Sequence, residues 1–124
     1  LDDLPVLVSA ARMAGADVTA ELHGESSAVP AVVSREVYRI LQECLTNVVR
    51  HAGRVPVTMT VAVAAGGLRA TVTNPLGEAR AQRPGGGRGL RGMAERAELL
   101  GGTFGAGPVG LCWEVVVTVP WGSR

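Results

Sequence analysis

Four polar side chains that could act on a nucleotide fall within one short stretch of the sequence. Glu43, Asn47, Arg50 and His51 supply a carboxylate, an amide, a guanidinium and an imidazole. An amide oxygen can join Mg²⁺, a hard ion that keeps several waters and bridges phosphates. A carboxylate one helical turn away can polarise a nucleophile or orient metal-bound water, and the two later side chains could meet phosphate oxygens. Together these groups suit a nucleotide held through a metal ion.

These residues lie on a predicted helix over Ala31–Ala52. Its apolar residues recur at helical spacing and form a wide stripe, namely Val33, Val37, Ile40, Leu41, Cys44, Leu45 and Val48. At about 100° per residue, Glu43 and Asn47 fall about 40° apart, on the shoulder where this stripe meets the polar face. A shoulder position borders a cleft, so its side chain is partly desolvated and still reachable by a ligand. Two alternatives stay open: a solvated face formed by Glu43, Asn47 and Arg50, and a helix cap or packed histidine at His51.

A second stretch, Gly85–Met93, is rich in glycine and leads into a predicted helix over Gly89–Leu100. Residues 87–92 satisfy the GxGxxG pattern of dinucleotide-binding folds, which requires a strand directly before it and an acidic residue at the end of the next strand. Here a loop precedes the pattern and the one acidic candidate, Glu114, lies inside a strand, so we reject that interpretation. Glycines entering a helix leave N–H groups free to bind phosphate, and the loop could close over a nucleotide as a lid. A flexible linker is the alternative.

The rest of the chain predicts an α/β fold: a two-layer sandwich over a mixed, mainly antiparallel sheet. A first helix follows Asp2 and Asp3, either of which can cap it, and ends at Gly15. Alternating apolar residues predict strands over 17–23, 57–63, 68–73, 103–106 and 111–120. Pro75–Arg88 is poor in apolar residues, so we expect a mobile loop that is poorly ordered without nucleotide. About three amphipathic helices would cover the one apolar face of the sheet.

Composition limits the class of protein. The chain has 124 residues, enough for one domain with a modest core, and 47% of them are apolar. A net charge of +1 gives no sign of contact with duplex DNA. Two cysteines are too few for a disulfide scaffold, so Cys44 and Cys112 are expected to be buried, reduced thiols. No apolar run is long enough to span a bilayer and no secretory leader precedes Leu1, so we expect a cytoplasmic domain without membrane contact.

The order of these motifs resembles the ATP-binding catalytic domain of sensor histidine kinases. The Glu43, Asn47 and Arg50-His51-Ala52 helix comes first, followed by a hairpin, a loop and the glycine-rich helix start. This GHKL or Bergerat-fold domain shares its fold with gyrase, the heat-shock chaperone of ninety kilodaltons and MutL. The phrase Gly-Leu-x-Gly-Met-x-Glu-Arg-x-x-x-Leu-Gly-Gly, which begins at Gly89, resembles the subclass whose partner regulators carry LuxR-type DNA-binding domains. The resemblance covers essentially the whole chain.

The resemblance implies a role for each matching residue. Asn47 would coordinate Mg²⁺ and Glu43 would be the catalytic acidic residue. Other contacts to ATP would come from Arg50, His51, Gly87, Arg88, Gly89 and Leu90, at the phosphates, the lid hinge and the nucleotide wall. The adenine-reading box would be residues 73–77, with Asn74 and Gly77 as nucleotide contacts. Asn74 stands where the family usually has Asp, so its contact with the adenine amino group should be weaker by about 1 kcal/mol.

The resemblance also implies partners and leaves two alternatives. Residues 1–124 would be the catalytic domain of a larger sensor, and the γ-phosphoryl group of ATP would pass to a histidine on a separate dimerisation domain and then to a response regulator. Neither His23 nor His51 has the setting of that acceptor, so the chain alone should not phosphorylate itself. One alternative is a degenerate relative that binds nucleotide poorly and acts through protein contacts, as Asn74 suggests. The other is an anti-sigma-type serine kinase of the same fold, against which the phrase from Gly89 argues.

Overall fold

The computed structural model describes residues 1–51, 55–75 and 87–121, with only the backbone described at 51 and 87–89. The elements follow one another as α1 (Leu4–Met13), β1 (Asp17–His23), the 3₁₀ turn η1 (Ser26–Ala28), α2 (Ala31–His51), β2 (Pro56–Ala64), β3 (Gly67–Pro75), α3 (Gly87–Leu99), β4 (Thr103–Val109) and β5 (Cys112–Pro120). This order matches the predicted one, element for element, apart from the added 3₁₀ turn.

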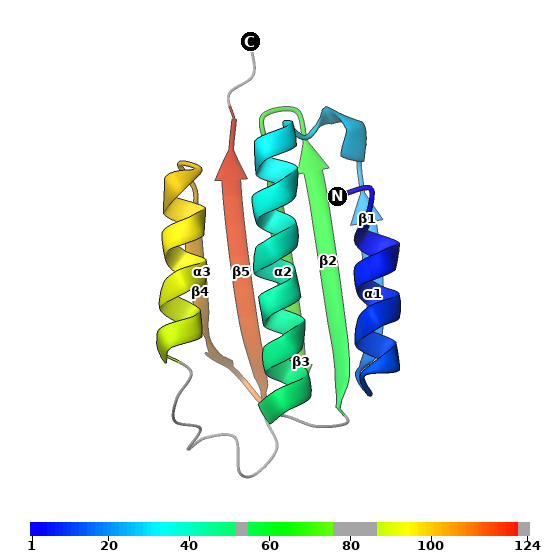
Figure 1. Cartoon of the computed structure of the whole chain (residues 1–124). Helices are drawn as coiled ribbons and strands as arrows, with labels where there is room; N and C mark the ends of the chain where they lie inside the picture. The colour runs from blue at the N-terminus through cyan, green and yellow to red at the C-terminus, as the bar shows by residue number, and fades with distance from the viewer. Residues whose placement is uncertain (52–54, 76–86, 122–124) are drawn as a thin grey trace.

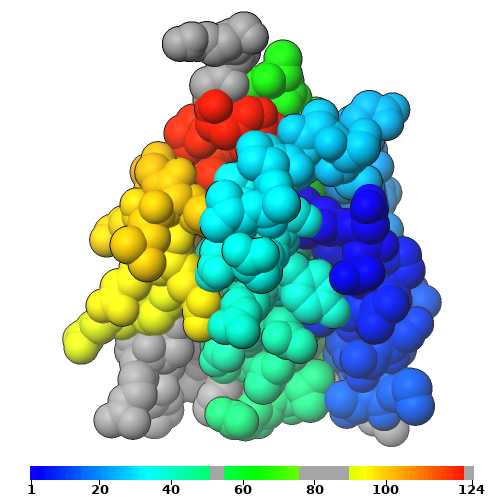
Figure 2. Space-filling view, turned by 45° about the horizontal axis from the view of Figure 1, so that its top comes forward, coloured from blue at the N-terminus to red at the C-terminus, as the bar shows by residue number. Residues whose placement is uncertain are grey.

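The strands form one sheet in the order β1-β2-β3-β5-β4. β1 pairs with β2 in parallel, whereas the β2–β3, β3–β5 and β4–β5 pairs are antiparallel. The three helices lie on one face of this sheet (Figure 1). In the space-filling view, the surface of α2 lies between those of α1 and α3 (Figure 2). The prediction of a two-layer α/β sandwich over a mixed, mainly antiparallel sheet is confirmed.

The core is the interface between α2 and the central strands. Every residue of the predicted apolar stripe of α2 is buried, and Val37, Ile40 and Leu41 have no exposed surface. Opposite them, alternate residues of β2, β3 and β5 point inward, among them Met59 and Val117, which are also fully buried. This alternation arises because successive side chains of a strand point to opposite faces. The amphipathic pattern of the long helix therefore fixes how it lies on the sheet.

The predicted cap of the first helix is wrong in its chemistry. Asp3 occupies the N-cap position but makes no side-chain capping hydrogen bond. An N-cap side chain usually accepts from the second or third helical N–H, and Pro5, at the second position, has no N–H to donate. The Asp2 carboxylate instead accepts a hydrogen bond from the Ser26 hydroxyl at 2.6 Å. Asp2 therefore ties the start of α1 to η1.

Four further boundaries or burials differ from the prediction. α3 begins at Gly87, two residues before the predicted start, and β3 continues to Pro75. β4 continues to Val109 because it stays paired with β5 as far as Cys112. Cys112 is half-buried, not buried, since it opens the strand at the end of the sheet. The remainder of the predicted loop, residues 76–86, lies outside the described residues.

Candidate functional site

The last turns of α2 and the first turn of α3 lie at the same end of the molecule. Arg96 Nη1 donates to Glu36 Oε1 at 2.9 Å, and Cys44 Sγ lies 3.5 Å from Met93 Sδ. Residue numbers rise along α2 between these two contacts and fall along α3, so the two helices run in opposite directions (Figure 1). This antiparallel arrangement brings the glycine-rich start of α3 to the end of α2 that carries Asn47.

Glu43 and Asn47 lie on the side of α2 that faces α3. They follow Glu36, which contacts α3, by seven and eleven residues, or about two and three helical turns. Both side chains are half-buried, whereas Arg50 is exposed. The half-buried state is the one predicted for a shoulder position. Glu43 and Asn47 are therefore less exposed than a fully solvated face would make them, and their roles stay predictions.

Asn74, near the end of β3, lies in the sheet at this same end of the molecule. Thr73 pairs with Thr58 near the start of β2, which follows α2 in the chain, so the end of β3 lies at the end of the sheet beneath the last turns of α2. Asn74 lies on the helix-covered face of β3, the same face as Val72, and is only 5% exposed. Its Nδ2 donates to the Pro75 carbonyl at 2.9 Å. This bond does not use the side-chain oxygen Oδ1, which is an acceptor.

The thiol of Cys44, the residue next to Glu43, is uncharged at neutral pH. Burial first, and the negative charge of Glu43 second, raise the pKa of the Cys44 thiol to about 12. A thiol of this pKa stays protonated, and the thiolate is the nucleophilic form. Cys44 is therefore a packing residue beside the candidate site, and both cysteines are free.

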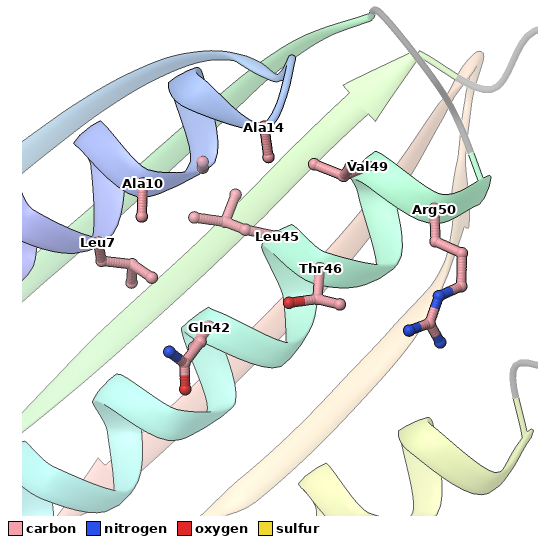
Figure 3. A pocket seen from close by; sticks show the side chains of 9 residues that line it. Leu7, Ala10, Ala14, Gln42, Leu45, Thr46, Val49 and Arg50 are labelled. Carbon is pink, nitrogen blue, oxygen red and sulfur yellow. The ribbon is translucent and has the colours of Figure 1, made fainter.

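A separate pocket of about 430 Å³ lies on the opposite side of α2, against α1 (Figure 3). Its lining residues are Leu7, Ala10, Ala11, Ala14, Gln42, Leu45, Thr46, Val49 and Arg50. The Arg50 side chain extends away from α1 in this view (Figure 3). Sequence reasoning missed this pocket, although Ala10 and Ala11 of α1 and Ala14 just after it were a signal, because small side chains leave space between neighbouring helices. Glu43 and Asn47 do not line it.

The side chains at the candidate site fit a magnesium ion that is held mainly by phosphate oxygens and waters, with few protein ligands. Among the described residues, no group of three or more His, Cys, Asp or Glu could hold a metal ion. A Mg²⁺ ion at Asn47 would therefore need other ligands. Phosphate oxygens and waters are the ligands that Mg²⁺ commonly keeps when a protein supplies few side chains.

Comparison with known proteins identifies the architecture. No family model matches the chain. Over 78 residues the chain is 42% identical to Sensor histidine kinase YxjM of Bacillus subtilis (strain 168), an alignment that covers 60% of this chain and 18% of that protein. The blue-light activated histidine kinase of Erythrobacter litoralis EL346 superposes with a TM-score of 0.73 at 22% identity, covering 94% of this chain and 43% of that one. The catalytic domain of histidine kinase ThkA superposes with a TM-score of 0.60 at 15% identity, covering 95% and 92%.

The fold is that of histidine kinase catalytic domains. The chain spans less than half of the Erythrobacter protein and about a fifth of YxjM, so these matches concern one domain of longer proteins. The predicted resemblance is confirmed at this level. The subclass with LuxR-type regulators stays a prediction. Within the described residues no helix is long and apolar enough to cross a membrane.

Within this histidine kinase fold, the predicted site residues separate into three groups. Glu43, Asn47, Arg50 and Asn74 are placed at one end, as described above. Gly87 and Gly89 lie in the first turn of α3, and Leu90 is half-buried against the core. Gly77 and the side chains of His51 and Arg88 lie outside the described residues. Sequence reasoning gave no role to Glu36, whose bond to Arg96 joins α2 to α3.

Proposed function

We propose that this chain binds ATP with Mg²⁺ and is the kinase domain of a two-component sensor. It would transfer the γ-phosphoryl group to a histidine of a dimerisation domain. A response regulator would then receive the group from this histidine. In this proposal, that regulator carries a LuxR-type DNA-binding domain. One observation carries the proposal: Asn47, Asn74 and the first turn of α3 lie at the same end of a histidine kinase fold. An ATP-dependent kinase of this kind would act in the cytoplasm.

Each group at this end would contact a different part of ATP. The Asn47 oxygen would ligate Mg²⁺, and Glu43, one turn before it, would orient the attacking group. The N–H groups of the first turn and the dipole at the start of α3 favour phosphate there. Buried Asn74, near the end of β3, would accept from the adenine amino group through Oδ1. His51, Gly77 and Arg88 remain proposed nucleotide contacts on the strength of the resemblance.

Transfer would depend on positioning and on neutralisation of charge. The bond between the γ-phosphorus and the bridging oxygen of ADP breaks while a bond forms to an imidazole nitrogen of the acceptor. The charge that develops on the phosphate oxygens needs the metal ion and the N–H groups around it. Such a mechanism requires no covalent intermediate on this chain. Removing the metal ligand should therefore reduce both nucleotide affinity and transfer.

Asn47→Ala tests this assignment directly. Isothermal titration with Mg²⁺ and a non-hydrolysable ATP analogue should show affinity at least about tenfold weaker than wild type, because a charge-assisted contact is lost. Thr46→Ala is the matched control, since Thr46 is exposed and lines the pocket on the other side of α2. The control should bind as wild type. Equal affinity in wild type and Asn47→Ala would refute the role of Asn47.

The nature of the acceptor is tested in a full-length protein that contains this chain. After incubation with ATP and Mg²⁺, the phosphorylated product should be labile in acid and stable in base, as phosphohistidine is. An acid-stable product would favour the serine kinase of the same fold. Asn47→Asp in the same protein should lower the amount of labelled product.

One observation favours a second candidate, a degenerate relative that acts through protein contacts. The family's adenine-reading carboxylate is replaced by Asn74, a neutral amide whose nitrogen is already bonded to Pro75. The wild-type titration separates the two functions. Heat of binding at micromolar to millimolar analogue supports the kinase, and its absence at millimolar analogue supports the degenerate relative.

A further inference from the structure

The second half of α3 is fixed to the rest of the fold along one face. Met93 and Ala97 are 2% and 0% exposed. Met93 meets Cys44 of α2 through sulfur atoms 3.5 Å apart. Arg96 donates to Glu36 at 2.9 Å. These contacts fall within residues 93–97, and Leu90 at the end of the first turn also packs half-buried against the core, so residues 87–89 precede them along the helix.

A small change in the tilt of α3 would displace its first residues. At 1.5 Å per residue, Gly87 lies about 9 Å before Met93 and about 14 Å before Arg96. A tilt of about 10° around Arg96 would therefore move the first turn by about 2 Å. Hydrogen bonds to a phosphate group tolerate only a few tenths of an ångström. The contacts at 93–97 thus decide whether the N–H groups of the first turn meet a nucleotide in the geometry of binding.

The ion pair adds to these apolar contacts a further restraint on the tilt. Met93 is unbranched and its thioether adapts to altered packing, and Ala97 has only a methyl group. The Arg96–Glu36 bond has a defined direction, and the two side chains are 41% and 25% exposed. This ion pair joins two helices, whereas the Glu21–His23 hydrogen bond lies within β1.

We propose that Glu36 and Arg96 are positioning residues for the nucleotide: their ion pair holds the tilt of α3 so that its first turn meets the phosphate groups. This inference rests on the proposed function and assigns a role to two residues that are not among the proposed nucleotide contacts. Neither side chain would touch ATP. The pair would act on affinity for the nucleotide and leave the chemical step, which involves Glu43 and Asn47, unchanged.

The test uses Glu36→Gln, Arg96→Gln and the reversed pair Glu36→Arg with Arg96→Glu. In titrations with Mg²⁺ and the ATP analogue, each single variant should bind about three- to fivefold more weakly, the range that a half-exposed ion pair can supply. The reversed pair should recover most of the wild-type affinity. In the full-length protein, the single variants should raise KM for ATP and leave kcat unchanged. Glu21→Gln, which removes the carboxylate of β1 that contacts His23, is the control and should bind as wild type.

The outcomes separate this inference from the proposed function. Absence of wild-type binding would remove the proposed function and this inference with it. Wild-type binding with unchanged affinity in both single variants would overturn the inference alone. Weakened single variants without recovery in the reversed pair would also overturn it, because they would indicate a general loss of packing. Thermal melting of each variant, measured alongside, confirms that the compared proteins are folded.

Discussion

Cys44 shows how one buried atom makes stability depend on pH. Its thiol lies at the α2–α3 contact, and burial together with Glu43 raises its pKa from the usual 9.0 to about 12. Above about pH 9 the unfolded chain loses this proton while the folded chain keeps it. The unfolded state then binds fewer protons than the folded state, so stability falls as pH rises.

We therefore expect the free energy of unfolding to fall with pH more steeply in wild type than in Cys44→Ala. The stabilising contribution is fully present below pH 9 and decreases through the window from 9 to about 12, by up to about 1.4 kcal/mol per pH unit. Urea denaturation of both proteins at pH 8, 9 and 10 measures the difference. All other ionisable groups are common to the two proteins. Parallel curves would contradict the prediction.

At the scale of elements, two glycines at the end of α3 are required for different structural reasons. Gly101 has a φ of +79°, and the N–H groups of Gly101 and Gly102 donate to the carbonyls of Glu98 and Ala97. This is the Schellman arrangement, in which a left-handed residue ends a helix. Gly102 has an ordinary φ, but a Cβ built on it would overlap the Thr118 carbonyl oxygen of β5. Gly102 is thus required by close approach of α3's end to the sheet.

We expect Gly102→Ala to destabilise the chain by about 1–3 kcal/mol, because backbone must shift to admit the methyl group. Gly105→Ala in β4 is the matched control, since a Cβ there meets nothing within 4 Å. The control should change stability by less than about 0.5 kcal/mol. Chemical denaturation of the two variants measures both values. A loss as large in Gly105→Ala as in Gly102→Ala would show that close approach is not the cause.

At the scale of the whole molecule, the proposed ligand joins elements that are far apart in sequence. The end of α2, the end of β3 and the start of α3 come together only in the folded chain. A ligand that binds this arrangement binds the folded state alone. It should therefore shift the unfolding equilibrium by mass action.

ATP analogue and Mg²⁺ at about one hundred times the dissociation constant should stabilise the fold by about 2.7 kcal/mol. For a chain of this size the melting temperature should rise by roughly 10 °C. Asn47→Ala, with affinity at least about tenfold weaker, should show at most about half of this rise at the same ligand concentration, and Thr46→Ala should show all of it. Differential scanning calorimetry provides the measurement. An equal rise in both variants would mean that the ligand binds elsewhere.

Most of the element order could be predicted from the sequence, and part of the candidate site. The stripe of α2 and the alternation of β2, β3 and β5 are short-range patterns, repeated every 3.6 or 2 residues, so they report the local conformation and the buried face. The same periodicity put Glu43 and Asn47 on a half-buried shoulder. The family resemblance supplied the roles of these residues, which no spacing alone contains.

Local patterns could not supply the contacts between distant segments. The bond from Glu36 to Arg96 spans 60 residues and the Cys44–Met93 contact spans 49. Such contacts depend on strand order and on the relative direction of helices, which follow from packing of the whole core. The sequence by itself determined the elements, their buried faces and the motifs they carry. Tertiary structure decided that α3 lies antiparallel to α2, since only the folded sheet brings two helices separated by a hairpin to the same face.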